Sequence, residues 1–309
     1  MHEIRSVVIL GAGAMGAVYA ARFARAPDLG VAFLARGERA ARLRAEGVTV
    51  NGSRLDMPVV DAGAPTPAPA DLVIVALKDH ALAEALPDLS AVVGPETTIL
   101  SVMNGLDSEA TLAAAYGQAR VLYAIAVGID ALREVVADDS DRVTFTTSGK
   151  LIFGEARNDE LSPRVRCVQA ALDRAGLAHE TPVDMIRMLW WKFMVNVGIN
   201  QASAVMRAPY AVFQVSREAQ ALMESLMREA IALAQHLGID LRESDIDAWY
   251  TFLNTLSPQG KTSMLQDIEA GRRTEVEIFG GKVVALGAVH GIPTPVNETV
   301  LHIIRVLER

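Results

Sequence analysis

Three polar side chains recur at steps of four along one strongly apolar segment. They are Lys192, Asn196 and Asn200, within residues 190–200. The segment is predicted to be helical, and steps of four then place all three side chains on one row of the helix. Left buried without partners, such groups would cost about 1–3 kcal/mol each. The row therefore either points out of the core, as lysines that extend along apolar surface do, or converges on a polar ligand.

The residue types in this row suit the reduction of a carbonyl group. That reaction builds negative charge on oxygen, so a lysine can stabilise the charge and also release a proton to it. Amides donate and accept hydrogen bonds without adding charge. A second polar segment, residues 261–275, contains Ser263 and Glu275 and reads as helix, break, helix. There a serine can equally cap a helix, and a glutamate can equally favour a helix start.

Length and composition restrict the class of protein. A chain of 309 residues with 51% hydrophobic content is expected to form two domains. A single cysteine, Cys167, excludes an internal disulfide, and the first residues lack the layout of a secretory signal, so we expect a cytoplasmic protein. No apolar run reaches the ~20 residues of a membrane span. The net charge of -8 disfavours nucleic acid, and we assign no metal site.

The first twenty residues contain a glycine-rich turn. A short apolar run, residues 6–10, precedes Gly11, Ala12, Gly13, Ala14, Met15 and Gly16, and a segment of helical periodicity, residues 17–26, follows. In a strand–turn–helix context, the first glycine makes a tight turn, the second lets backbone approach a pyrophosphate, and the third allows close packing of helix on strand. The helix N-terminus adds amide donors. This motif predicts a dinucleotide site.

Three further residues follow predicted parallel strands. Arg36 follows residues 31–35, at a position where an NAD site usually has an acid, so it favours the 2′-phosphate of NADP(H) unless it is an ordinary exposed arginine. Lys78 follows residues 71–77, and Asn104 follows residues 98–102. Ligands of open α/β sheets bind at this edge, although a loop lysine and a turn asparagine remain possible readings.

Helical patterns dominate the chain after Pro182. We therefore predict an α/β protein with an N-terminal Rossmann-type dinucleotide-binding domain, residues 1–182, and an all-α C-terminal domain, residues 183–309. Whether the apolar helices pair two subunits in a homodimer or pack within one chain stays open.

Taken together and in order, these motifs make the chain resemble the ketopantoate reductase family. The resemblance rests on the glycine motif, Leu77-Lys78, Asn104-Gly105, the Lys192 row and the segment from Ser263 to Glu275. It implies reduction of 2-dehydropantoate to pantoate by NADPH. It also implies that Lys192 donates the proton to the ketone oxygen and that Glu275 orients the substrate hydroxyl.

The resemblance implies the other roles as well. Asn104 and Ser263 would bind the substrate carboxylate, Asn196 and Asn200 would be substrate-side amides, and Lys78 and Arg36 would contact NADP(H).

One departure from the family pattern concerns the substrate. Tyr210 stands where the family usually has a further substrate-binding asparagine, which leaves the reaction type alone but opens the identity of the 2-oxo acid. A paralogous reductase of another 2-oxo acid is therefore an alternative. Two others are a 3-hydroxyacid dehydrogenase of the hydroxyisobutyrate type, which explains Lys192 and Asn196 but not Ser263 to Glu275, and an NADP-binding sensor without catalysis.

Overall fold

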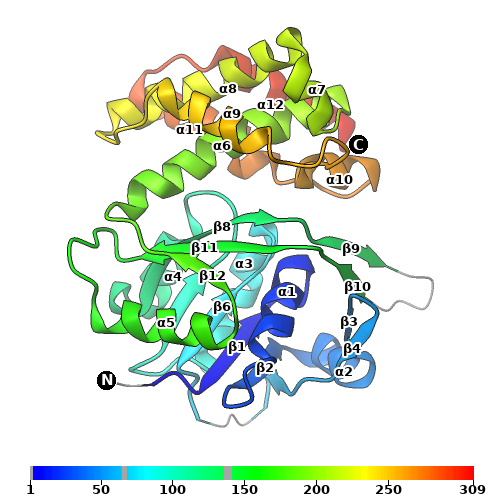
Figure 1. Cartoon of the computed structure of the whole chain (residues 1–309), viewed down its shortest axis with the longest axis vertical. Helices are drawn as coiled ribbons and strands as arrows, with labels where there is room; N and C mark the ends of the chain where they lie inside the picture. The colour runs from blue at the N-terminus through cyan, green and yellow to red at the C-terminus, as the bar shows by residue number, and fades with distance from the viewer. Residues whose placement is uncertain (1–2, 65–67, 136–140) are drawn as a thin grey trace. The chain divides into compact units, whose positions relative to one another are not determined.

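The computed structural model describes residues 3–64, 68–135 and 141–309 (Figure 1). The chain divides into two compact units, Met1–Met185 and Ile186–Arg309. This division falls a few residues after the boundary that the sequence suggests at 182/183. Among the described residues the first unit is α/β and the second is all-α, so the predicted fold class is confirmed.

A parallel sheet forms the centre of the first unit. Its six parallel strands are β1 (Ser6–Leu10), β2 (Gly30–Ala35), β5 (Val59–Asp61), β6 (Leu72–Val75), β7 (Thr98–Ser101) and β8 (Val121–Ile129). In space they run β5-β2-β1-β6-β7-β8. Numbered along the chain this is the order 3-2-1-4-5-6, which is typical of dinucleotide-binding folds. Two strands extend the sheet beyond β8: β11 (Ser148–Gly154), antiparallel to it, and then β12 (Ala178–Glu180).

Both faces of this sheet are covered because its strands are apolar on both sides. Val7 and Ile9 of β1 pack into one cluster, and Val8 and Leu10 pack into another. The first cluster includes residues of α1 (Ala14–Phe23), α2 (Gly37–Glu46) and α5 (Pro163–Arg174). The second includes residues of α3 (Asp79–Ala85), the 3-10 helix η1 (Leu86–Ala91) and α4 (Ser108–Tyr116). Runs of buried apolar residues on both sides are expected of a parallel sheet between helices.

A second, smaller sheet packs with the first cluster. It contains β4 (Ser53–Leu55), β3 (Val48–Val50), β10 (Asp141–Thr144) and β9 (Leu132–Val135), in that order. The predicted hairpin at residues 48–55 is present, with Asn51 and Gly52 both at positive φ, as a two-residue hairpin turn requires. A further short 3-10 helix, η2 (Gln118–Arg120), leads into β8.

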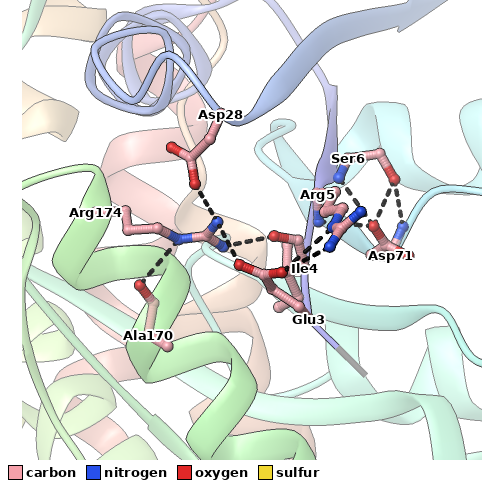
Figure 2. A network of polar contacts seen from close by, with 8 residues as sticks. All are labelled: Glu3, Ile4, Arg5, Ser6, Asp28, Asp71, Ala170 and Arg174. Atoms are coloured by element: carbon pink, nitrogen blue, oxygen red, sulfur yellow. Dashed lines mark hydrogen bonds and ion pairs between the residues drawn. The ribbon is translucent and has the colours of Figure 1, made fainter. Parts of the chain in front are cut away.

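Polar contacts fasten the start of β1 (Figure 2). The guanidinium of Arg174, at the end of α5, donates to the Ile4 carbonyl and pairs with Asp28 at 2.6 Å. On the other side of the same segment, one carboxylate oxygen of Asp71 accepts from the Ser6 backbone N–H and hydroxyl, both at 2.9 Å. The strand that carries the glycine-rich turn is therefore tied to α5 and to the segment before β6.

The second unit is built around one long helix, α6 (Met185–Met206). The others are α7 (Tyr210–Val215), α8 (Arg217–His236), α9 (Ser244–Leu253), α10 (Ser263–Glu269), η3 (Val276–Ile278), α11 (Gly280–His290) and α12 (Pro295–Leu307). A Cβ on Gly198 would lie 2.5 Å from the Met227 side chain and 2.9 Å from the Met223 carbonyl oxygen. The absence of a side chain there allows α6 and α8 to approach closely.

Candidate functional site

The glycine-rich turn lies between β1 and α1, as the sequence predicts. Gly11 adopts φ +107°. A Cβ on Gly16 would lie 1.8 Å from the Gly11 carbonyl oxygen, so the absence of a side chain at residue 16 allows the turn and α1 to approach this closely. Gly13 precedes the helix, and no described heavy atom lies within 4 Å of where its Cβ would stand. Ala14 and Met15 open α1, earlier than residue 17, where the periodic segment was expected to start. The turn thus combines an open backbone with a helix N-terminus, which suits a pyrophosphate group.

Arg36, Lys78 and Asn104 follow the carboxyl ends of β2, β6 and β7, in a sheet where β1 lies between β2 and β6. Arg36 and Lys78 are the residues that immediately precede α2 and α3. The Nε–H of Arg36 donates to a carboxylate oxygen of Asp88 on η1 at 2.5 Å. Neither sequence reading of Arg36 included this ion pair.

A buried hydroxyl network supports the turn that carries Asn104. Ser101 ends β7, and its Oγ accepts from the Met103 backbone N–H at 3.3 Å. Ser101 lies 2.7 Å from the hydroxyl of Ser108, which in turn donates to the carboxylate of Glu109 at 2.9 Å. All three side chains of this network are buried. Since Ser108 donates its proton to Glu109, the hydroxyl of Ser101 donates to Ser108. This hydrogen bond links the residue before the turn, Ser101, to the first residue of α4, Ser108.

The polar row predicted on the long helix is present on α6. The Nδ2 of Asn200 donates to the Oδ1 of Asn196 at 3.1 Å. The hydroxyl of Ser263, the first residue of α10, donates to the Oδ1 of Asn200 at 3.4 Å. Asn200 is only 4% exposed, whereas Asn196 and Lys192, one and two turns earlier, are half-buried. The structure therefore joins Ser263 to two residues of the row.

The neighbour of Ser263 fixes its position. The hydroxyl of Thr262 accepts from the Leu265 backbone N–H at 3.2 Å and so caps α10. It also donates to the hydroxyl of Ser203 on α6 at 3.1 Å, and Ser203 donates to the Ala208 carbonyl at 2.8 Å. The alternative reading, in which Ser263 itself caps the helix, is wrong, because Thr262 takes that role.

Glu275 lies immediately before η3 and is 7% exposed. The sequence predicts a single helix after the break that follows α10, whereas the structure has a short 3-10 helix, η3, and then α11. On one side Thr274 accepts from the Val276 backbone N–H at 3.1 Å and donates to Glu308. On the other, Glu277 forms two hydrogen bonds with Arg305 of α12, both at 2.8 Å. These contacts hold both flanks of Glu275 against the end of α12.

Tyr210 opens α7 and packs beside the segment that leads to α10. Its backbone N–H donates to the Gly260 carbonyl at 3.0 Å, and a Cβ on Gly260 would lie 2.9 Å from the tyrosine ring. Burial raises the pKa of the Tyr210 phenol to about 12. Tyr210 is therefore a bulky group that stays neutral at physiological pH.

Some contacts of the candidate residues in each unit could not be predicted from the sequence. Asp88 pairs with Arg36, which is distant in the sequence. Glu109 accepts from Ser108 near the turn that carries Asn104. Thr262, the neighbour of Ser263, donates to Ser203 of α6. Asp88 and Ser203 are polar residues in largely apolar segments, whereas Glu109 and Thr262 stand among other polar residues and give no local signal. Among the described residues, no three His, Cys, Asp or Glu side chains form a group that could hold a metal ion. None of the helices described is long and apolar enough to cross a membrane.

Curated proteins of similar sequence extend along nearly the whole chain. A 2-dehydropantoate 2-reductase from Mesorhizobium japonicum is 28% identical, with 97% of this chain and 96% of that protein covered. One from Halobacterium salinarum is also 28% identical, with 98% and 99% covered.

Solved structures agree in fold. A putative ketopantoate reductase from Ralstonia solanacearum MolK2 is 26% identical, with a TM-score of 0.82 over 99% of this chain and 98% of that one. A D-mandelate dehydrogenase in a ternary structure with NADH and anilino(oxo)acetate has a TM-score of 0.86, with 98% of each chain covered. At 18% identity, the second likeness concerns the fold alone.

Family models account for both units of the chain. The model described as ketopantoate reductase PanE/ApbA matches residues 7–158, and the model of the C-terminal part of the same proteins matches residues 184–308. The two matches include the glycine-rich turn and the Lys192 row, respectively. The chain therefore belongs to the ketopantoate reductase family.

Proposed function

We propose that this protein reduces 2-dehydropantoate to pantoate with NADPH. The observation that carries the proposal is the polar row on α6, where Asn196, Asn200 and Ser263 are hydrogen-bonded in series and Lys192 lies one turn before Asn196. Nucleotide binding is assigned to the first unit, through the turn from Gly11 to Gly16 with Arg36, Lys78 and Asn104. The names of the curated relatives support the substrate.

The chemistry needs a hydride and a proton. When bound, NADPH would supply the hydride to the carbonyl carbon and would itself be oxidised to NADP⁺. The protonated amine of Lys192 donates its proton to the carbonyl oxygen as negative charge develops there, so the product is the 2-hydroxy acid. Lys192 is half-buried, so its ammonium would interact more strongly with the developing negative charge than it would in bulk water.

The remaining groups are assigned to substrate binding. Asn104 and Ser263 bind the carboxylate of the 2-oxo acid, and Asn196 and Asn200 hold it without adding charge. Glu275 orients the substrate hydroxyl and pairs with Lys192 before substrate arrives. Its rigid flanks support the first of these roles, since an orienting group is effective only when it is itself held.

A second candidate substrate is another 2-oxo acid with a bulkier or less polar side chain. The observation that favours it is the half-buried, neutral ring of Tyr210 beside the segment that precedes Ser263. A phenol ring in that place offers more apolar surface and fewer hydrogen bonds than an amide.

A panel of 2-oxo acids tests both candidates. Initial rates of NADPH oxidation would be measured with ketopantoate, its analogue without the hydroxyl group, and phenylglyoxylate, at several concentrations of each. We expect kcat/KM to be highest for ketopantoate. A higher value for either other acid selects the second candidate, and oxidation of a 3-hydroxy acid with no turnover of any 2-oxo acid rejects both.

We also propose that the protein is a cytoplasmic enzyme and that it forms a homodimer. Large exposed apolar side chains on α11 and α12, among them Val289 and Val306, support self-association. Light scattering of the purified protein at micromolar concentration tests this, and a monomeric mass would reject the dimer.

A further inference from the structure

Arg36 is held by a carboxylate from another part of the chain. Its Nε–H donates to Oδ1 of Asp88 at 2.5 Å. The side chain of Arg36 is 57% exposed, whereas that of Asp88 is 12% exposed. The pair therefore joins a surface guanidinium to a largely buried carboxylate. A buried carboxylate requires such a partner, so the contact is expected to persist when a ligand binds beside it.

Asp88 stands on a firmly attached element. It belongs to η1, which contacts β2, the strand that ends just before Arg36. The hydroxyl of Tyr116, at the end of α4, donates to the Leu86 carbonyl of η1 at 2.5 Å. Asp88 thus provides a fixed anchor for a side chain that would otherwise move freely at the surface.

The anchored end of Arg36 leaves the other end for a ligand. A guanidinium has five N–H donors, and a phosphate is bound best by two parallel ones on its fork. Within the described residues, the hydrogen bond that Arg36 makes through its side chain uses the Nε–H. A carboxylate of the neighbouring strand, that of Asp61 at the end of β5, has its own partner in Arg44 at 3.5 Å. The two terminal amino groups of Arg36 therefore keep their capacity for phosphate oxygens.

We propose that Asp88 is a positioning residue that sets the preference of the nucleotide site for NADPH over NADH. It does so by holding Arg36 through Nε, so that less side-chain freedom is lost when the terminal amino groups bind the 2′-phosphate. The inference rests on the proposed use of NADPH. A carboxylate that merely neutralised Arg36 would have the opposite effect, because its removal would release the arginine for the phosphate.

The test is a comparison of dissociation constants for NADPH and NADH, measured from the change in nicotinamide fluorescence on binding to the full-length protein. Asp88→Ala is expected to weaken NADPH by about tenfold and NADH by less than about twofold. Asp88→Asn, which keeps an oxygen acceptor for the Nε–H, is expected to fall between Asp88→Ala and the wild type. The matched control is Asp56→Ala, which removes an exposed acid paired with exposed Arg54 and should change neither constant.

A double-mutant cycle separates positioning from a general structural effect. In an Arg36→Ala background, Asp88→Ala should cause no further loss of NADPH affinity, since its action passes through the arginine. Three results would each overturn the inference. They are an equal loss of NADPH affinity from Asp88→Ala in both backgrounds, tighter NADPH binding in Asp88→Ala, and unchanged NADPH binding in Asp88→Ala. If Arg36→Ala itself weakens both nucleotides equally, the proposed NADPH preference fails as well. If Arg36→Ala selectively weakens NADPH and Asp88→Ala does not, only the role of Asp88 is rejected.

Discussion

Replacement of Asn200 by alanine separates substrate binding from fold stability in the polar row. The amide is 4% exposed and makes two side-chain hydrogen bonds, at 3.1 Å to Asn196 and at 3.4 Å from Ser263. Each bond is worth roughly 0.5–1.5 kcal/mol net, the longer one at the low end, and alanine recovers about 0.5 kcal/mol through its helix propensity. Unfolding free energy should therefore fall by about 0.5–1.5 kcal/mol.

The loss of kcat/KM for the 2-oxo acid in Asn200→Ala should exceed what this loss of stability explains. If the row binds a charged 2-oxo acid, Asn200→Ala removes a charge-assisted hydrogen bond and should lower kcat/KM by about 10- to 100-fold. The affinity for NADPH should stay unchanged. Denaturant unfolding gives the unfolding free energy, and NADPH titration gives the dissociation constant of NADPH. Steady-state rates at varied concentrations of the 2-oxo acid give kcat/KM.

The matched control for Asn200 is the next residue on the same helix. Gln201 is fully buried and donates to the Val197 carbonyl at 2.8 Å and to Asn297 of α12 at 2.9 Å. Gln201→Ala should lose similar or greater stability with little change in KM. A normal kcat/KM in Asn200→Ala, or the same kinetic loss in both variants, would refute the assignment of the row to substrate.

Three further predictions concern the elements that hold the site. Thr262→Val should lower the unfolding free energy by about 1 kcal/mol through loss of the helix cap and raise KM for the 2-oxo acid, and Thr262→Ser should restore both; an unchanged KM would show that Ser263 does not depend on its neighbour. The Arg305 guanidinium lowers the pKa of Glu277, so this pair stabilises the fold above the usual carboxylate pKa and the gain is lost as pH falls below it. Because both side chains are 45% exposed, wild type should exceed Glu277→Gln by at most about 1 kcal/mol in urea unfolding at pH 7, and the gap should close near pH 3; a gap that widens in acid would contradict this sign. Arg174→Ala should destabilise the first unit by about 1–2 kcal/mol and speed hydrogen exchange in β1, and unchanged exchange there would show that the contacts of Figure 2 do not hold the strand.

The elements of the fold were largely predictable because their signals are local. Unbroken apolar runs predicted the central strands, and the Asn51-Gly52 pair predicted the hairpin turn. Element ends were less accurate. The helix after the glycine-rich turn begins at Ala14, since a helix can start as soon as the glycine turn ends, and a small residue such as Gly16 is no obstacle in its first turn.

Long-range partners were not predictable in the same way. The row on α6 followed from its spacing, but the link from Ser263 to Asn200 spans a long stretch of sequence and depends on how α10 packs on α6. Asp88 lies within η1, after α3, and has no spacing relation to Arg36, so only the folded chain shows the ion pair. Tyr210 was noticed as a departure from the family pattern, whereas its packing on Gly260 came from the structure.

The most direct test of the account is the rate of NADPH-dependent reduction in Lys192→Ala, compared with Lys150→Ala, a lysine paired with Glu180 in the first unit. The account predicts that kcat for the best 2-oxo acid falls by ~10²-fold or more in Lys192→Ala, as expected for loss of a general acid, while NADPH affinity and the Lys150 variant stay near wild type. Near wild-type turnover in Lys192→Ala would contradict it.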